Sequence, residues 1–336
     1  MHLVQIANGP LRRVAVVGEP HLILLLEVDS VLALVQRSLA EGHPLTDTVK
    51  NLLSDETLSY DEVYEGRSPW KLLTPIDYPG DPQRILVSGT GLTHLGSARE
   101  RQAMHLAATA EQEAQMTDSM RMFEWGMQKG RPASGAIGIA PEWFYKGDGS
   151  MLRGPHTALE IPGHAEDGGE EAEVAAIYYI ADDGKPWRIG MTAANEFSDH
   201  VFERRNYLNL AGSKLRTCSI GPELVVDAPF DDIAGQVRIL RNGAAIWQKA
   251  IRTGEQNMCH SLANVEHHHF KFAGHRQPGM LHVHFMGADN LSFGEGIRLQ
   301  TDDVTEVEFA GFGRALRNTI ERDETMTEPV RVQAMR

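Results

Sequence analysis

Residues 168–185, GGEEAEVAAIYYIADDGK, carry two properties that conflict in a soluble protein. From residue 174 to 181 the chain is apolar and rich in β-prone side chains, which is typical of a buried strand. Yet three carboxylates, Glu170, Glu171 and Glu173, stand where this strand begins. Like charges held this close are unfavourable unless a cation lies between them. The stretch therefore predicts a positively charged partner inside the fold.

The turn after this strand predicts where a further carboxylate lies. The sequence DDG at 182–184 is typical of a tight hairpin turn. Glu171 lies twelve residues before Asp183 and Glu196 lies twelve residues after Gly184, so the hairpin brings Glu196 back beside the first strand. Residues two apart in a strand share a face at roughly 7 Å, and a hard divalent cation such as Mg²⁺ accepts carboxylate oxygens. The alternative is that these glutamates lie on a solvated strand edge.

The composition describes an acidic globular protein. The chain has 336 residues, of which 42% are hydrophobic and 23% are charged, and its formal net charge is −14. This composition supports a large core, and the negative charge disfavours nucleic acid or an anionic membrane as a partner. Two cysteines, Cys218 and Cys259, argue against a disulfide framework. The N-terminus lacks a signal-peptide pattern and no apolar run is long enough to cross a membrane, so we expect a cytoplasmic protein.

The pattern along the chain divides it into two parts. Residues 74–83, TPIDYPGDPQ, contain three prolines and a glycine, which is typical of a linker. We therefore expect a small N-terminal α/β domain over residues 1–78 and a catalytic domain over residues 79–336. In the first domain, short strands precede two helices, which we expect within residues 29–42 and 46–54.

The second domain combines a few helices with many strands. Helices are expected over residues 97–115 and 118–130, after which short β-prone segments alternate with Gly, Pro and Asp. The expected strands include AIGIA (136–140) and GIRLQT (296–301), and RNG at 241–243 predicts a second hairpin. Many strands with few helices between them predict a β-rich α+β fold, a mixed sandwich or roll, and not a doubly wound sheet.

The order of several short motifs resembles the catalytic domain of the fumarylacetoacetate hydrolase superfamily over residues 84–318. The motifs of that family have counterparts here in GLTHLGSARE (91–100), WFYKGDG (143–149), EAEVA (171–175), GMTAANEFS (190–198), AGSKLRTCSIGP (211–222), HFMGADN (284–290) and AGFGRALRN (310–318). Each motif alone is weakly specific, and their shared order carries the resemblance. It implies the mixed β-sandwich roll of that family.

The resemblance implies a metal site and a class of substrate. By position, Glu171, Glu173 and Glu196 would bind Mg²⁺ or another divalent cation such as Mn²⁺ or Ca²⁺. Glu196 stands where the family usually has an aspartate, so its side chain is one methylene longer. The family's substrates are 2-oxo acids or their enols, whose carboxylate and keto oxygens chelate the metal and so stabilise a forming enolate. The resemblance also implies a homodimer.

One departure from the hydrolytic members of the family bears on the reaction. Ser97 occupies the place of the histidine that helps to activate water, whereas Glu100 keeps the place of the glutamate and His94 lies three residues before Ser97. A serine hydroxyl does not act as a base at neutral pH without an activating partner. Hydrolysis of a C–C bond is therefore disfavoured, and Ser97 is expected to contact the substrate instead.

Two lysines are candidates for the same site. Gly212 stands where the family has a lysine, and Lys214 follows two residues later, on the same face if the segment is extended. Lys214 would pair with the substrate carboxylate, or move a proton at C3 if desolvation lowers its pKa; the alternative is a surface lysine. Lys146 matches a family lysine that orients substrate, and Gly287 and Ala288 of the HFMGADN motif are expected to bind substrate.

Within the superfamily, the sequence is most similar to the sugar-acid branch, the 2-keto-3-deoxy-sugar-acid dehydratases of non-phosphorylative pentose catabolism. We therefore expect a hydro-lyase that converts 2-keto-3-deoxy-D-pentonate to 2,5-dioxopentanoate and water, with Lys214, Glu100 and His94 as proton carriers. Two alternatives remain. One is a hydrolase that cleaves a C–C bond of a 2,4-diketo-3-deoxy sugar acid, and the other is a non-catalytic sugar-acid-binding protein, which would not need the three acidic metal positions.

A histidine-rich segment offers a competing metal site. The sequence HSLANVEHHHF contains His260, His267, His268 and His269. Three consecutive histidines do not all face one metal ion from a regular helix or strand, and the spacing of zinc motifs is absent. We therefore expect structural or surface positions for these side chains.

Overall fold

The computed structural model describes residues 1–107, 117–325 and 328–335, with only the backbone for residues 104–107. The N-terminal part consists of β1 (His2–Asn8), β2 (Leu11–Gly18), β3 (His21–Leu25), α1 (Val31–Glu41), α2 (Leu45–Asn51), β4 (Leu53–Ser59), α3 (Tyr60–Tyr64) and β5 (Lys71–Leu72). The predicted first helix is confirmed, since Ser30 caps α1 through its side chain and Gly42 ends it in the left-handed conformation. The second predicted helix corresponds to the shorter α2.

Strands dominate the rest of the chain. Its helices are α4 (Leu95–Ala107), α5 (Asp118–Lys129), α6 (His200–Arg205), α7 (Leu210–Lys214) and α8 (Leu262–Phe270). Its strands are β6 (Ile85–Gly91), β7 (Glu142–Asp148), β8 (Leu152–Arg153), β9 (Leu159–Ile161), β10 (Ala172–Ile180), β11 (Pro186–Asn195), β12 (Cys218–Ile220), β13 (Leu224–Val225), β14 (Ile233–Arg241), β15 (Ala244–Thr253), β16 (Leu281–Phe285), β17 (Val304–Phe309) and β18 (Leu316–Arg322). This strand-rich architecture confirms the predicted α+β class.

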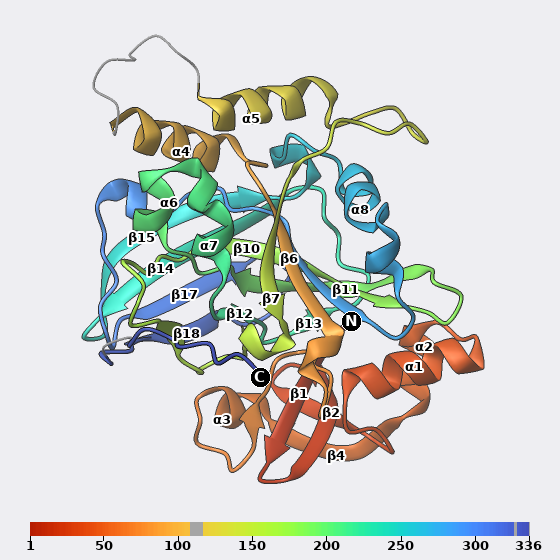
Figure 1. Ribbon diagram of the computed structural model, residues 1–336. Helices are drawn as coiled ribbons and strands as arrows, with labels where there is room; N and C mark the ends of the chain where they lie inside the picture. Colours follow the sequence, from red (N-terminus) through yellow and green to blue (C-terminus); the bar gives the residue numbers. More distant parts are fainter. Residues whose placement is uncertain (108–116, 326–327, 336) are drawn as a thin grey trace.

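Within the described residues the strands form two sheets (Figure 1). The larger sheet has the order β4-β3-β2-β1-β13-β11-β10-β16-β6-β7, with β5, β8 and β12 attached beside this path, and the smaller sheet has the order β15-β14-β17-β18-β9. β1 pairs with β13 through Leu3 and Leu224, so the N-terminal segment continues the sheet of the second part. The boundary predicted after residue 78 lies in a stretch without helix or strand and stays a prediction.

Both predicted hairpins are present, but two predicted strands are not. β10 pairs with β11 and β14 with β15, each in antiparallel order. Residues 136–140 and 296–301 form no strand. In the first segment, Gly138 N donates to the side chain of Asn264 and Ile139 N to the carbonyl of Lys129, so helices take the bonds that a strand partner would need. The predicted helix over 97–115 is present up to residue 107, and its remainder lies outside the described residues.

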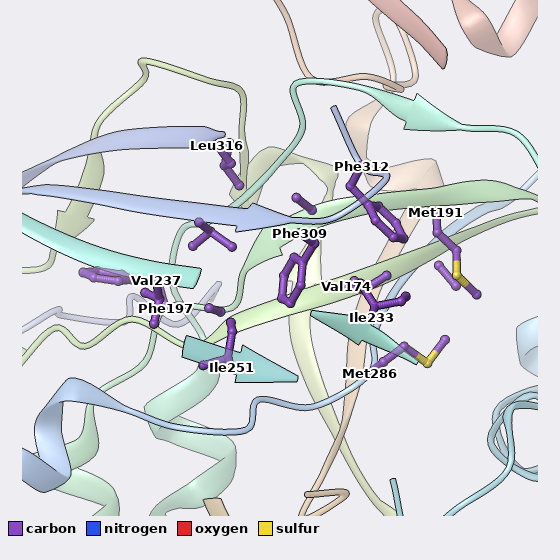
Figure 2. Close-up of a cluster of buried hydrophobic side chains, with 14 of the residues drawn as sticks. Val174, Met191, Phe197, Ile233, Val237, Ile251, Met286, Phe309, Phe312 and Leu316 are labelled. Atoms are coloured by element: carbon purple, nitrogen blue, oxygen red, sulfur yellow. The ribbon is translucent and has the colours of Figure 1, made fainter. Parts of the chain in front are cut away.

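The main core lies between the two sheets, where side chains of β10, β11, β14, β15 and β17 meet (Figure 2). β10 is buried along its entire length. Its two faces serve different cores, because Val174 and Ala176 pack between the sheets whereas Ala175 and Ile177 pack on the side of α1. This two-sided burial explains why the strand reads as an unbroken apolar run. Among the helices in the described ranges, none has the length and apolar character needed to span a bilayer.

A cluster of three histidines, His269, His282 and His284, is buried between α8 and the larger sheet. Trp143 Nε1 donates to His269 Nδ1 at 3.2 Å, so Nδ1 is an acceptor and the ring proton of His269 lies on Nε2. His269 Nε2 therefore donates to His282 Nδ1 at 2.9 Å. His284 contacts two hydroxyl groups of β6 with its ring nitrogens. Burial and neighbouring histidines lower the pKa of His282 and that of His284 to about 3. His269 is therefore structural and His267 is exposed, as expected, and no three histidines of the described residues meet as potential metal ligands.

We expect the free energy of unfolding to fall as the pH drops from 6.5 towards 3. The folded pKa values of His282 and His284 lie below the ordinary 6.5, so the unfolded chain binds protons that the folded cluster excludes. The contribution of these histidines to the free energy of unfolding is fully present above pH 6.5 and is lost as the pH falls towards 3. The free energy of unfolding then changes by about 1.4 kcal/mol per pH unit for each excluded proton. Chemical denaturation across this range measures the slope. Because burial also lowers the pKa of His269, H269Q should show a shallower slope, whereas the exposed-site control H267Q should match wild type; equal slopes in all three proteins would contradict the prediction.

Candidate active site

The ends of β10 and β11 place the three predicted glutamates together. Glu173 pairs with Ala194 across the hairpin, and the backbone N–H of Glu196 donates to the carbonyl of Glu171 at 3.0 Å. Glu171, Glu173 and Glu196 are 6%, 1% and 0% exposed. One carboxylate oxygen of each lies within 4.8 Å of the others. The side chains thus converge as the hairpin predicted, and they are buried, so the solvated-edge alternative is wrong.

Two buried lysines supply positive charge to these carboxylates. Lys214, at the end of α7, donates from Nζ to Glu171 Oε1 at 2.5 Å. The same Nζ contacts Glu196 Oε2 and lies 2.9 Å from Ser198 Oγ. Lys146, on β7, lies with its Nζ 2.6 Å from Glu196 Oε1. Both lysines are fully buried, so the surface position considered for Lys214 is excluded.

The buried charges shift the proton affinities within the site. Burial acts to lower the pKa of Lys214, but the carboxylates of Glu171 and Glu196 outweigh it and the pKa is raised. For Lys146 burial prevails and the pKa is lowered. Burial and the two neighbouring carboxylates raise the pKa of Glu173 well above its ordinary value. We expected Lys214 to act as a base only if desolvation lowered its pKa. Because its pKa is raised instead, Lys214 carries its proton at neutral pH.

The oxygen atoms of this group fit a hard divalent cation. Glu171 Oε1 is committed to Lys214 and His200, and Glu173 Oε2 accepts the backbone N–H of Gly287 at 2.6 Å. Within the described ranges, the second oxygen of each of these two carboxylates makes no hydrogen bond. Carboxylate oxygens are the donors that Mg²⁺, Mn²⁺ and Ca²⁺ prefer. An ion held between them would also offset the excess negative charge of the three glutamates.

The loop after β16 orients Glu173. Gly287 has a φ of +95°, which residues other than glycine rarely adopt. A Cβ at this position would lie 1.9 Å from Thr93 Oγ1. Gly287 thus allows the tight turn from which its N–H reaches the Glu173 carboxylate. Ala288 follows as a buried residue, and the substrate contacts expected for these two residues stay predictions.

Glu100, on α4, lies against the segment that follows the β16 loop, whereas His94 and Ser97 have local partners. Glu100 Oε2 accepts the N–H of Leu291 at 3.1 Å, and burial raises the pKa of Glu100 to about 7. His94 contacts Thr93 Oγ1 at 2.8 Å, and burial lowers its pKa to about 4. Ser97 Oγ donates to the carbonyl of His94 at 3.2 Å. Of the three, Glu100 is the group that exchanges a proton near neutral pH.

Sequence reasoning missed a buried ion-pair network that anchors α4. Arg101 Nη1 donates to both carboxylate oxygens of Glu142, at 3.0 and 2.9 Å, and Arg101 Nε lies 2.8 Å from Glu203. Tyr207 donates its hydroxyl to Glu142 at 2.6 Å. Because Arg101 follows Glu100 directly, this network fixes the turn of α4 that carries Glu100. No local signal predicts it, since its members come from α4, β7, α6 and the turn after α6.

Solved structures provide matches over nearly the entire chain. The apo form of 2-keto-3-deoxy-D-arabinonate dehydratase matches with a TM-score of 0.70 at 16% identity, covering 97% of this chain and 100% of that chain. The same dehydratase complexed with magnesium and 2,5-dioxopentanoate gives the same values. A 5-carboxymethyl-2-hydroxymuconate delta-isomerase from Mycobacterium smegmatis matches with a TM-score of 0.59 at 15% identity, covering 96% of this chain and 100% of that chain.

The protein has the fumarylacetoacetate hydrolase fold. The predicted fold is thereby confirmed, although no family model matches the sequence. A search of curated proteins also finds no match. In the fumarylacetoacetate hydrolase fold of this chain, the buried glutamates lie where β10, β11, β7, α7 and the loop after β16 meet.

Replacing Glu171 or Glu173 with glutamine should weaken Mg²⁺ binding, because each substitution replaces a negatively charged carboxylate ligand with a neutral amide. Isothermal titration calorimetry of Mg²⁺ into E171Q and E173Q should show a dissociation constant raised by at least about tenfold. The neighbouring Glu170 is a matched control. Its carboxylate accepts from Ser292 N at 2.7 Å and Ser292 Oγ at 2.6 Å, so E170Q should keep the wild-type affinity. A metal affinity unchanged in E171Q and E173Q would remove the metal assignment.

Proposed function

We propose that the protein is a metal-dependent dehydratase of 2-keto-3-deoxy sugar acids, which converts 2-keto-3-deoxy-D-pentonate to 2,5-dioxopentanoate and water. The observation that supports this proposal most directly is the buried group of Glu171, Glu173 and Glu196 beside Lys214. The proposal is supported by a fold whose solved examples include a dehydratase complexed with magnesium and 2,5-dioxopentanoate. We also propose a role in pentose catabolism, a homodimeric state and a cytoplasmic location, as expected from the sequence.

The three glutamates would hold the divalent ion, and the two buried lysines would balance their charge. When bound, the ion supplies a positive centre for the carboxylate and 2-keto oxygens of the substrate, which makes the C3 proton more acidic. Lys146 stays paired with Glu196 and keeps that carboxylate in place. Ser97, Gly287 and Ala288 border the substrate in this proposal, as the motif positions imply.

Glu100 and Lys214 carry the protons of the elimination. The pKa of Glu100, raised by burial to about 7, suits a general base at neutral pH, and its carboxylate takes the proton from C3. Lys214 is protonated because its carboxylate neighbours raise its pKa. It donates to the C4 hydroxyl as the C4–O bond breaks, which releases water. The C3=C4 product then tautomerises to 2,5-dioxopentanoate. His94, with a lowered pKa and a threonine partner, is left with a supporting role.

Purified protein with Mg²⁺ should convert at least one 2-keto-3-deoxy acid of a stereochemical panel to a semialdehyde, detected by coupling to an aldehyde dehydrogenase. A chelator should abolish turnover and added Mg²⁺ should restore it, because the glutamates need the ion to bind a 2-oxo acid. A panel of 2,4-diketo acids tests the hydrolase alternative in the same assay. No turnover with any 2-keto-3-deoxy acid would reject the dehydratase, and C–C cleavage of a diketo acid would replace it.

The rate constant kcat/KM should fall as the pH drops below about 7, because a base must be unprotonated to act and burial raises the pKa of Glu100 to that value. E100Q should lose about 10²- to 10⁴-fold in turnover rate, with Mg²⁺ binding unchanged, since Glu100 is not among the three converging carboxylates. Rate measurements between pH 5.5 and 9 at saturating metal, roughly two units on either side of that pKa, test the profile. An active E100Q protein, or a flat profile across pH 7, would assign the base elsewhere.

A further inference from the structure

We infer that His200 is a positioning residue that determines which oxygen of Glu171 faces the metal site. The inference rests on the proposed function in one respect, namely that a divalent ion binds Glu171. It assigns a role to a side chain that lies two residues beyond Ser198, the end of the GMTAANEFS motif, and that sequence reasoning did not single out.

His200 and Lys214 both bind the same oxygen of Glu171. His200 Nε2 lies 3.1 Å from Glu171 Oε1, and Lys214 Nζ lies 2.5 Å from that atom. Oε2 of Glu171 meets no donor in the part of the chain that the structure describes. Two donors on one oxygen restrict rotation of the carboxylate, so the free Oε2 is the oxygen left for an ion shared with Glu173 and Glu196.

The chain holds the His200 ring in one orientation. A Cβ at Gly169 would lie 2.2 Å from His200 Nδ1, so the ring packs directly on the glycine backbone. Gly169 is itself fixed, because it exchanges two backbone hydrogen bonds of 2.9 Å with Ser198. The ring of Phe293 lies 5.0 Å from the His200 ring, measured between centroids. The His200 ring therefore has little freedom to turn.

This packing also determines where the imidazole proton is needed. His200 Nδ1 is buried without a hydrogen-bond partner among the described residues, whereas Nε2 faces a carboxylate oxygen. The proton consequently lies on Nε2, which donates to Glu171. Partners behind a metal ligand orient that ligand, and their loss typically costs about 10- to 100-fold in metal affinity. Without His200, Lys214 alone would hold Oε1, and the carboxylate would be free to turn both oxygens towards the ammonium group.

Two amide substitutions test the role of His200 with little difference in chemistry. In H200Q the side-chain amide nitrogen reaches the position of Nε2, whereas in H200N the same amide is one methylene shorter and does not reach Glu171. Mg²⁺ titration calorimetry and Mn²⁺ paramagnetic resonance should give H200Q an affinity within about threefold of wild type and H200N an affinity lower by about 10- to 100-fold. The exposed-site variant H164Q should match wild type.

Turnover gives a second readout that a merely structural role would not produce. In H200N the Mg²⁺ concentration for half-maximal rate should rise by the same factor as the dissociation constant, while the rate at saturating Mg²⁺ should stay within about threefold of wild type, since His200 acts through Glu171. Wild-type metal affinity in H200N overturns the inference, and so does an equal loss in H200N and H200Q. The metal titrations contain no sugar acid, so absence of dehydratase turnover would reject the proposed function while leaving the positioning role to these titrations.

Discussion

Three carboxylates and two ammonium groups share one buried position at the ends of β10 and β11, and much of the surrounding structure satisfies that constraint. Charged groups removed from water destabilise a protein unless each is paired. Here the partners come from separate segments: Lys214 from α7, Lys146 from β7, the Gly287 N–H from the loop after β16 and His200 from α6. The requirement for pairing therefore ties four segments to one hairpin. Among the described residues it leaves one oxygen of Glu171 and one of Glu173 without a hydrogen bond.

The sheets make this arrangement rigid. β10 is buried on both faces, so the strand that carries Glu173 has little freedom to move. The same burial excludes water, which strengthens every charge interaction at the site. Helix α4 is held by Arg101, whose partners Glu142 and Glu203 lie on β7 and α6. These two elements also carry Lys146 and His200, so they connect α4 to the glutamate group. Glu100 itself is not one of the three converging carboxylates.

The relation to solved structures separates fold from chemistry. At 16% identity the dehydratase shares the fold over 97% of this chain, so the architecture tolerates replacement of most side chains. The motif resemblance predicts that Ser97 takes the place of a histidine, and this stays a prediction. The local hydrogen bond of Ser97 to the His94 carbonyl gives this serine a partner within its own helix turn.

The sequence by itself determined the hairpin and the meeting of Glu171 with Glu196, because a tight turn is a local property and counting outward from it brings these two residues together. The register shift between Ile177 and Tyr178 is not contained in that count. It failed for AIGIA and GIRLQT, since β-prone residues form a strand only where a partner strand is available. Only the tertiary structure decided the raised pKa of Lys214 and the orientation of the Glu171 carboxylate. Proton affinity and orientation are sums over burial, charge and donors from segments far apart in the chain, and no local pattern contains those sums.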